Sequence, residues 1–297
     1  MKDAAAILRE RARSGVALGL FTTYRVGGPA DLFLEIHGPA DLDLACRAVA
    51  ATGVPVLVIG RGSNLLIADA GFRGLAVKLG DAFAAVDMSG TDVRAGGAAA
   101  LPVLARRTAA GALTGLEWAV GVPGSVGGAV RMNAGGHGSE TRDTLRRVGL
   151  VDLGRGAETE IAGAELVLGY RRSSVTPDQV VLWAEFGLRE GDREASEAEV
   201  AGIVRWRREH QPGGANAGSV FTNPSGDSAG RLIDAAGLKG HRVGSAVVSP
   251  KHANFFQADE DGSADDVRAL IDEVRRLVEE RMGVLLEPEL RMIGFTR

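Results

Sequence analysis

The stretch NAGSVFTNP, residues 216–224, places the hydroxyl of Ser219 in a segment too broken for a helix and too polar for a buried strand. A serine hydroxyl can act as a nucleophile or move a proton, and nucleophilic serines often lie in a Gly-x-Ser-x-Gly turn. Here Gly218 precedes Ser219, but Phe221 stands where the closing glycine is expected. The segment alone therefore also fits a turn capped by serine and asparagine side chains.

Three further stretches carry ionisable residues that chemistry could use. LGYRRSSV contains Arg171, whose guanidinium can hold a carboxylate or phosphate, although a surface arginine in a strand explains it equally. LEPEL predicts Glu287 and Glu289 on one face of a strand, where a solvated edge is the simpler reading. His252 in SPKHANFF fits a hydrogen-bonded core histidine better than a catalytic one.

Two glycine-rich turns, GRGSNLL and GVPGSVGGAVRMNAGG, each follow an apolar stretch and could direct backbone N–H groups at a phosphate. Neither is a Rossmann fingerprint, because Leu65 replaces the last glycine of the first turn and no helix is predicted after it. A Gly-Lys-Ser/Thr phosphate loop is also missing. Together the turns suggest a dinucleotide, whereas either one alone also fits a tight connection between strands.

Composition limits the class of protein. The chain has 297 residues, of which 45% are hydrophobic, and a formal net charge of -4 without a basic stripe, so a nucleic-acid partner is not expected. The single cysteine, Cys46, has no cysteine partner for a disulfide or a metal site, and no metal is predicted. The opening MKDAAAILRERARSG predicts a charged amphipathic helix, and no long apolar run follows, so we expect a cytoplasmic protein without a membrane segment.

The elements that would position these residues follow from periodicity and turn signals. A helix to about Arg13, a strand over 30–36, a helix over 41–52 stopped by Gly53 and a buried strand over 54–60 resemble a βαβ unit. Residues 61–80 are expected to be extended. Further predictions are a hairpin from 86 to 96, helices over 101–112, 129–132, 191–210, 228–236 and 263–282, and strands over 148–153, 158–162, 180–189 and 284–294.

Six motifs, taken in order, resemble one known family. They are GRGSNLL, GVPGSVGGAVRMNAGG, YRRS, NAGSVFTNP, AGRLIDAAGLKGHRVGSAVVSPKHANF and LEPELRMIG. As a set they closely resemble the UDP-N-acetylenolpyruvoylglucosamine reductases, flavoenzymes that make UDP-N-acetylmuramic acid for peptidoglycan. The resemblance extends from about Phe21 to Gly294, and the short link between YRRSS and VVLWAEF resembles the family's shorter, second type.

The resemblance implies an α+β fold that holds FAD as in the vanillyl-alcohol-oxidase type. A first flavin-binding subdomain would cover residues 1–78 and be completed by the final strand, 286–297. A second would cover 79–206, and a substrate-binding domain would cover 207–285. By the same resemblance the flavin would be held by two sets of turn residues, Arg61, Gly62, Ser63 and Asn64 in the first, and Gly124, Ser125, Gly127 and Gly128 in the second.

The family's reaction gives roles to the scattered polar residues. NADPH would reduce the FAD, and the flavin would then give a hydride to the vinyl carbon of the enolpyruvyl ether. Arg171 and Glu289 would stabilise the charge that develops, and Ser219 would deliver the proton as a general acid. Tyr170, His210 and Asn223 match positions that contact substrate, but Thr222 and His210 stand where many members have lysine.

Two other functions fit parts of the pattern. An oxidase or dehydrogenase of small alcohols would share the flavin turns, yet would have no reason to keep NAGSVFTNP together with LEPEL. A nucleotide-sugar binding protein without turnover is the second alternative. The sequence leaves open the choice between NADPH and NADH, and we expect a monomer.

Overall fold

The computed structural model describes residues 1–295, which form two compact units. Unit 1 comprises Met1–Ser14, Leu32–Arg61 and Gly74–Arg207. Unit 2 comprises Gly15–Asp31, Gly62–Arg73 and the stretch from Arg208 onward. Each unit is therefore assembled from segments that are far apart in the sequence.

The chain begins with a short helix, α1 (Lys2–Leu8), and a helix, α2 (Pro39–Thr52), that ends where Gly53 takes a left-handed φ of 61°. A four-stranded sheet has the order β1-β2-β5-β3. Its strands are β1 (Arg13–Ala17), β2 (Pro29–Ile36), β3 (Val56–Ile59) and β5 (Phe72–Leu79). The predicted strand over 30–36, helix over 41–52 and strand over 54–60 are confirmed, with β5 lying between β2 and β3 in the sheet.

The first helix is shorter than predicted. It ends at Leu8, and a 3₁₀ turn over Arg9–Arg11 leads directly into β1, where Arg13 is already extended. Arg9 has a φ of 51°, a left-handed conformation that an α-helix does not continue through. Helical periodicity is a local signal, and here pairing of β1 with β2 in the sheet overrides it.

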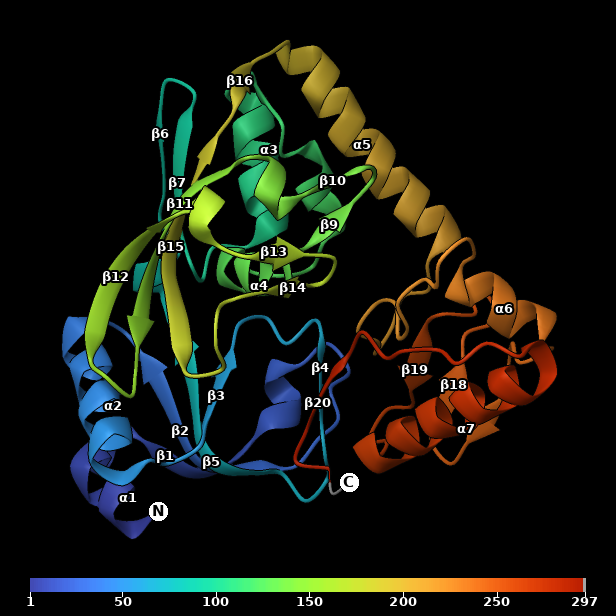
Figure 1. The fold of residues 1–297 in the computed structure, drawn as a ribbon, viewed down its shortest axis with the longest axis horizontal. Coiled ribbons are helices and arrows are strands. Elements are labelled where there is room, and N and C mark those ends of the chain that lie inside the picture. Colours follow the sequence, from blue (N-terminus) through green and yellow to red (C-terminus); the bar gives the residue numbers. More distant parts are fainter. Residues whose placement is uncertain (296–297) are drawn as a thin grey trace. The chain divides into compact units, whose positions relative to one another are not determined.

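The second sheet of unit 1 has the order β12-β11-β15-β7-β6, and every pairing in it is antiparallel. The hairpin of β6 and β7 was predicted, and helices α3 and α4 pack with this sheet in one apolar core (Figure 1). The elements are β6 (Val86–Ser89), β7 (Asp92–Gly96), α3 (Leu101–Ala110), α4 (Val126–Met132), β11 (Leu145–Asp152), β12 (Ala157–Ala162) and β15 (Gln179–Gly187).

Short strand pairs and one long helix complete unit 1. The helix α5 (Arg193–His210) confirms the predicted amphipathic helix, and its last three residues belong to unit 2. The 3₁₀ helix η4 (Glu117–Gly121) leads into the second glycine-rich turn. The short strands are β8 (Leu113–Thr114), β9 (Gly135–Gly136), β10 (Ser139–Glu140), β13 (Leu168–Gly169), β14 (Arg172–Ser173) and β16 (Arg189–Glu190).

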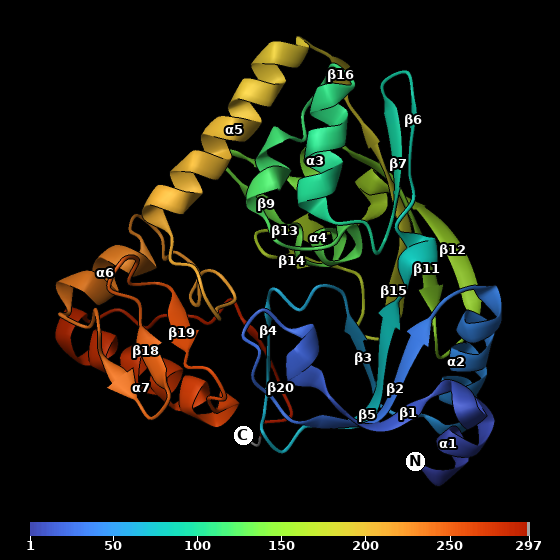
Figure 2. The ribbon, with the colours of Figure 1, turned by 180° about the vertical axis from the view of Figure 1, so that it is seen from behind.

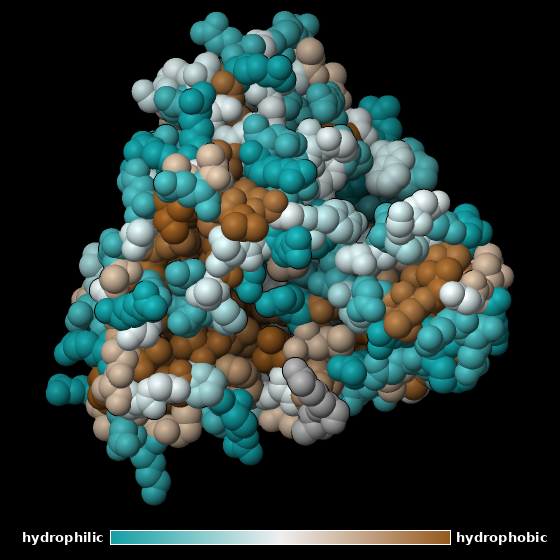
Figure 3. Space-filling model, in the orientation of Figure 1, coloured by the Kyte–Doolittle hydropathy of each residue, from teal (hydrophilic) through white to brown (hydrophobic). Residues whose placement is uncertain are grey.

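Unit 2 contains two helices, α6 (Ala229–Ala235) and α7 (Ala264–Met282), and a sheet of order β17-β18-β19 (Figure 2). One face of α7, from Val267 to Val278, is buried against this sheet, while hydrophilic side chains cover its outer surface (Figure 3). The strands are β17 (Arg242–Val243), β18 (Ala246–Val248) and β19 (Phe256–Ala258). The predicted cap of α7 is present, because the hydroxyl of Ser263 accepts a hydrogen bond from the N–H of Asp266 at 3.1 Å.

The predicted closing strand over 284–294 is mostly wrong. Only β20 (Arg291–Ile293) is a strand, and it pairs in parallel with β4 (Leu65–Ile67). The residues before it form a single isolated bridge, Pro288 with Phe221. Glu287 and Glu289 flank this bridge, where the N–H of Thr222 donates to the Glu287 carbonyl at 2.9 Å and the N–H of Glu289 donates to the Val220 carbonyl at 2.8 Å, so the pairing is confined to these residues and no regular strand forms.

Among residues 1–295 no helix is long and apolar enough to cross a membrane.

Candidate active site

The segment that carries Ser219 runs between two other segments of unit 2. On one side Val220 donates its N–H to the carbonyl of Asn254 at 2.8 Å, and Ser219 forms an isolated bridge with Phe255. On the other side Glu289 donates its N–H to the carbonyl of Val220 at 2.8 Å. Ser219 therefore lies in the middle of a short three-segment array rather than in a free loop.

Glu289 is held at the same time by the first glycine-rich turn. The side-chain amide of Asn64 donates to the carbonyl of Glu289 at 3.2 Å, and Arg291 donates its N–H to the carbonyl of Asn64 at 3.1 Å. Glu289 thus lies between Asn64 and the Ser219 segment. Three of the predicted site residues, Asn64, Ser219 and Glu289, which lie far apart in the sequence, are thus brought together within unit 2 by hydrogen bonds of Asn64, Val220 and Glu289.

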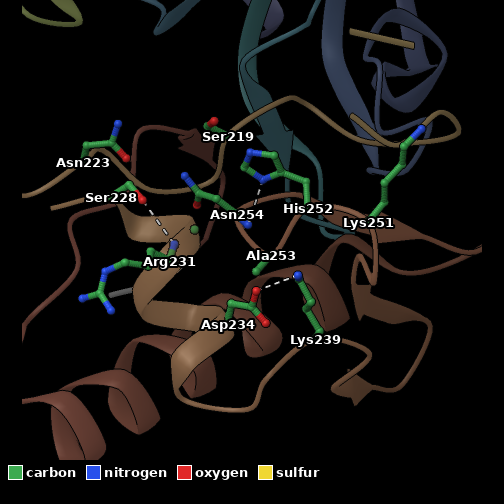
Figure 4. A pocket seen from close by; sticks show the side chains of 11 residues that line it. Ser219, Asn223, Ser228, Arg231, Asp234, Lys239, Lys251, His252, Ala253 and Asn254 are labelled. Carbon is green, nitrogen blue, oxygen red and sulfur yellow. Dashed lines mark hydrogen bonds and ion pairs between the residues drawn. The ribbon is translucent and has the colours of Figure 1, made fainter. Parts of the chain in front are cut away.

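A cavity of about 420 Å³ opens beside Ser219 (Figure 4). Its wall combines the Ser219 segment, the start of α6 and the segment 251–254. Polar and charged side chains dominate the lining, which comprises Ser219, Asn223, Ser228, Gly230, Arg231, Asp234, Lys239, Lys251, His252, Ala253 and Asn254. Such a lining suits an anionic, hydrogen-bonding ligand better than an apolar one.

The basic side chains of the cavity are held by neighbours of unit 2. Lys239 lies 2.7 Å from the Asp234 carboxylate, and Lys251 donates to the carbonyl of Arg208 at 2.6 Å. Arg231 pairs with Asp227 one turn earlier, outside the cavity lining. Three basic side chains line the cavity, and Asp234 is the only acidic residue among the lining residues. The cavity therefore favours a negatively charged ligand.

His252 lines the cavity. Burial lowers its pKa, because the low-dielectric surroundings disfavour the imidazolium. Its Nδ1 accepts a hydrogen bond from the N–H of Asn254 at 3.3 Å, and its ring packs edge to face on Phe255 with centroids 4.7 Å apart. The expectation of a hydrogen-bonded histidine is confirmed, although His252 lines a cavity instead of lying within a core.

Arg171 occupies the tip of a hairpin in unit 1, not a strand. Gly169 pairs with Arg172, which leaves Tyr170 and Arg171 as the two turn residues. Arg171 has a φ of 57°, an unusual value for a side chain of this size, and its Nη2 donates to the carbonyl of Gly135 at 3.2 Å. Tyr170 is 55% exposed, and the Arg171 guanidinium lies 5.1 Å from its ring centroid.

The two glycine-rich turns meet within unit 1. A Cβ atom added at Gly60 would lie 2.5 Å from the hydroxyl of Ser125, so a larger residue would displace this hydroxyl. The same hydroxyl caps α4 by accepting from the N–H of Gly128 at 3.3 Å. The two turns are therefore in contact, and their binding of a dinucleotide stays a prediction.

Three N–H groups of the second turn have partners inside the protein. The N–H groups of Val126 and Gly127 donate to the carbonyls of Ala99 and Gly97 at 2.9 Å, and that of Gly128 donates to Ser125. These bonds hold the turn against the neighbouring segment 97–99. Gly127 permits close packing, because a Cβ there would lie 3.2 Å from the Gly97 carbonyl oxygen.

The first turn continues into unit 2, where Gly62 takes a φ of 61° and a Cβ atom would lie 2.1 Å from the Phe21 carbonyl oxygen. Thr23 donates its N–H to the carbonyl of Gly62 at 3.3 Å. The hydroxyls of Thr23 and Tyr24 are buried and have no hydrogen-bond partner among the described residues. A buried hydroxyl without a partner is costly, so polar atoms of a bound group beside this turn would satisfy it.

Known proteins match this chain over almost its whole length. The solved structure of UDP-N-acetylenolpyruvylglucosamine reductase from Thermus caldophilus has a TM-score of 0.83 and 37% identity, covering 95% of this chain and 100% of that one. The UDP-N-acetylenolpyruvoylglucosamine reductase of Rubrobacter xylanophilus is 43% identical over 276 residues, 92% of each chain. That of Methylorubrum extorquens is 42% identical over 296 residues, 99% of this chain and 95% of the relative.

The chain belongs to the UDP-N-acetylenolpyruvoylglucosamine reductase family. Its residues 210–293 match the C-terminal domain of that family, and residues 30–162 match an FAD binding domain. The resemblance seen in the six motifs is confirmed, and so is an α+β fold with a flavin-binding part and a family-specific C-terminal part. As a member of the family the chain is an FAD-dependent oxidoreductase.

Sequence reasoning missed several polar residues around Ser219. Lys239 and Lys251 line the cavity, and they are two of only four lysines in the chain, a scarcity that could have drawn attention to them. The local sequence around Asn254 did not indicate its role, because that role depends on a contact with Phe221, 33 residues away. His210 is the exposed last residue of α5, and Thr222 bonds the carbonyl of Glu287, so neither is placed in the cavity lining.

Proposed function

We propose that the protein reduces the enolpyruvyl group of UDP-N-acetylenolpyruvoylglucosamine to the lactyl ether, giving UDP-N-acetylmuramate for peptidoglycan synthesis, with NADPH as reductant. The observation that carries the proposal is the hydrogen-bonded array of Ser219, Glu289 and Asn64 beside a polar, cation-lined cavity. A proton donor, a carboxyl group and a flavin-turn residue in one array are what a reduction of a carbon–carbon double bond requires.

The residues that would hold the flavin fit such a group. The predicted contacts are Arg61, Gly62, Ser63, Asn64, Gly124, Ser125, Gly127 and Gly128, and the unpartnered hydroxyl of Thr23 supports a ligand beside the first turn. When bound, FAD accepts a hydride from NADPH and supplies it to the substrate. The protein's own task is to place the double bond, stabilise charge and deliver one proton.

Ser219 delivers the proton to the carbon next to the substrate carboxylate as the vinyl carbon receives the hydride. The product thereby gains one hydride and one proton, which balances the reduction. Arg171 attracts the carboxylate, where negative charge accumulates, and its planar guanidinium can hold both oxygens. Glu289 donates a hydrogen bond when protonated or orients its neighbours when charged.

The cavity would receive the diphosphate and sugar of the substrate. Lys239, Lys251 and Arg231 provide positive charge, and Asn223, whose Oδ1 accepts from the N–H of Ala229 at 3.1 Å, is fixed at the start of α6. Tyr170 and His210 are further proposed substrate contacts. Lys239 and Lys251 would supply the charge that the family pattern expects from lysines at positions 222 and 210.

Substituting Ser219 by alanine separates the two half-reactions. Bleaching of the flavin by NADPH under anaerobic conditions should proceed as in the wild type, because the hydroxyl is not needed for that step. Reoxidation by UDP-N-acetylenolpyruvoylglucosamine should slow by about 10²–10⁴-fold, the usual loss for a positioned general acid. Stopped-flow absorbance of the flavin measures both steps.

Ser225→Ala provides a matched control, because Ser225 directly follows the segment 216–224 but is not among the residues that line the cavity. That variant should reoxidise at the wild-type rate. Reoxidation of Ser219→Ala at the wild-type rate, or an equal loss of bleaching, would remove Ser219 from the role of proton donor.

Four further parts of the proposal concern the whole chain. We assign residues 1–78, with 286–297, and 79–206 to flavin binding and residues 207–285 to substrate binding. A cytoplasmic location, a monomeric state and the preference for NADPH are also proposals. An oxidase of small alcohols and a non-catalytic nucleotide-sugar binder are the alternatives, and flavin reoxidation by the enolpyruvyl substrate distinguishes both from the proposed reductase.

A further inference from the structure

Asn254 makes an unusual set of contacts with the segment that carries Ser219. Its side-chain Oδ1 accepts from the N–H of Phe221 at 3.0 Å, and its Nδ2 donates to the carbonyl of Phe221 at 2.8 Å. Its own carbonyl accepts from the N–H of Val220 at 2.8 Å. Asn254 is 3% exposed, so water does not compete for these bonds. One residue thus satisfies three backbone groups directly after Ser219.

The asparagine side chain suits this contact because it has the donor and acceptor of a peptide group. It pairs with Phe221 as a neighbouring strand would, although no regular strand is present there. Aspartate lacks the donor, and a leucine lacks both groups. Loss of either bond would leave a buried backbone group of Phe221 without a partner.

The chain before Ser219 is restrained at Ala215, whose carbonyl accepts from the N–H of Ala258 at 3.0 Å, and at Gly218, whose N–H donates to Oδ1 of Asn216 at 3.1 Å. Gly218 takes a φ of 77°, a conformation that glycine adopts without strain. The backbone on the C-terminal side of Ser219 is restrained by a second set of bonds. Those bonds are the ones that Asn254 and, through Val220, Glu289 provide.

We propose that Asn254 is a positioning residue that fixes the backbone at Val220 and Phe221 and so aims the hydroxyl of Ser219 at the substrate carbon. The inference rests on the assignment of Ser219 as the proton donor. Asn254 does not transfer the proton itself. It acts through Ser219, because a proton must pass over a short distance along a defined direction and small displacements cost large factors in rate.

The test compares Asn254→Asp with Ser219→Ala and with the double variant. Asn254→Asp keeps the shape of the side chain but places an oxygen against the Phe221 carbonyl. Flavin bleaching by NADPH should be unchanged, and reoxidation by UDP-N-acetylenolpyruvoylglucosamine should slow by at least about 10-fold, the order expected for a misplaced catalytic group. In the Ser219→Ala background the Asn254 substitution should slow reoxidation no further.

Two additional variants separate positioning from loss of stability. Val278→Ala removes buried methyl groups from the same core without contacting Ser219, so it should lower the urea midpoint and leave reoxidation unchanged. Asn254→Ser, which retains a small group that can donate and accept, serves if Asn254→Asp does not fold. It should show the same selective slowing of reoxidation, to a smaller extent.

The outcomes distinguish this inference from the proposed function. If Ser219→Ala reoxidises at the wild-type rate, the assignment of Ser219 fails and Asn254 has nothing to position. If Ser219→Ala is slow but the Asn254 variants reoxidise normally, the inference about Asn254 is overturned alone. An equal slowing by Asn254→Asp with and without the Ser219 hydroxyl would also overturn it, because the two residues would then act independently.

Discussion

Arg171 combines a half-buried position at the tip of a hairpin with an unusual backbone conformation. A non-glycine residue at a φ of 57° is uncommon, and such strain persists only where surrounding contacts impose it. Here the bond from its Nη2 to the Gly135 carbonyl fixes the side chain in one direction. Asn133, fully buried, donates to the neighbouring carbonyl of Gly169 at 3.1 Å and restrains the same hairpin.

Arg171→Lys should therefore slow substrate reduction, although the substitution keeps the positive charge. Lysine cannot present two parallel N–H groups to a carboxylate and cannot replace the Nη2 contact at the same geometry. We expect bleaching by NADPH and the flavin content to remain at the wild-type level, and substrate reduction to fall by about 10²-fold or more. Stopped-flow reoxidation and the absorbance ratio of flavin to protein measure the two effects. Loss of FAD from this variant would make Arg171 a cofactor or structural residue instead.

Gly62→Ala adds one Cβ atom to the first flavin turn and tests whether the close packing there is needed for FAD binding. The residue has a φ of 61°, and the new Cβ would lie 2.1 Å from the Phe21 carbonyl oxygen, so the backbone must move. We expect a loss of about 1–3 kcal/mol in the free energy of unfolding and a weaker affinity for FAD. Urea unfolding of the apoprotein and titration with FAD give the two values. Gly53→Ala, at a similar φ but in open space, provides the control and should leave FAD affinity unchanged.

At the scale of elements, Glu117 connects the start of the second flavin turn to helix α5. Its Oε2 accepts from the N–H of Gly115 at 2.8 Å, and its Oε1 accepts from the hydroxyl of Ser196 at 2.7 Å. Both Glu117 and Ser196 are 5% exposed. Burial favours the neutral acid, but the hydrogen bonds to the carboxylate outweigh it and hold the pKa of Glu117 below its ordinary value.

The lowered pKa predicts how stability depends on pH. Because the folded state favours the carboxylate, the contribution of Glu117 is fully present above the ordinary pKa of about 4.3 and is lost as pH falls through the lower folded value. Glu117→Gln should be less stable than the wild type by about 1–3 kcal/mol at pH 7. The difference should shrink as the pH falls below about 4.3. Urea midpoints of both proteins at several pH values measure it, and a constant difference would contradict the assignment.

Elements with local signals could be predicted from sequence, and those set by distant contacts could not. Gly53 ends α2, and Ser263 caps α7, because each signal acts within one turn. The closing strand was overestimated, since residues 287–289 bond the Ser219 segment instead of forming a ladder of their own. Ser219 and Glu289 were named from motif resemblance, but their common link to Asn64 and the role of Asn254 depend on contacts that no local pattern encodes.

At the scale of the molecule, unit 2 depends on residues from the first quarter of the chain. Tyr24, Val26 and Leu66 belong to the same core cluster as α6 and α7. The carboxylate of Asp69 accepts from the N–H of Ala264 at 3.0 Å and from the hydroxyl of Ser263 at 2.5 Å, and so caps α7. The C-terminal part therefore shares its core and a helix cap with segments from the start of the chain.

A fragment of residues 208–297 should consequently fail to fold on its own. It would expose the core surface that Tyr24, Val26 and Leu66 cover, and it would leave β20 without β4. We expect no cooperative urea transition and little near-ultraviolet circular dichroism, whereas the full chain should show both. A fragment that unfolds cooperatively at the midpoint of the full chain would refute the dependence. In the full chain Asp69→Ala should cost about 0.5–2 kcal/mol, the usual effect of a lost cap.

The parallel pairing of β20 with β4 has a consequence for how the protein is made. During synthesis the ribosome releases Asn64 long before residues 289–291, and the chain grows at about 5–20 residues per second. The carbonyl of Asn64 and its side-chain amide receive their partners, Arg291 and Glu289, only once residues 289–291 have emerged. The first turn of the flavin site thus stays incomplete while the more than 200 intervening residues are synthesised.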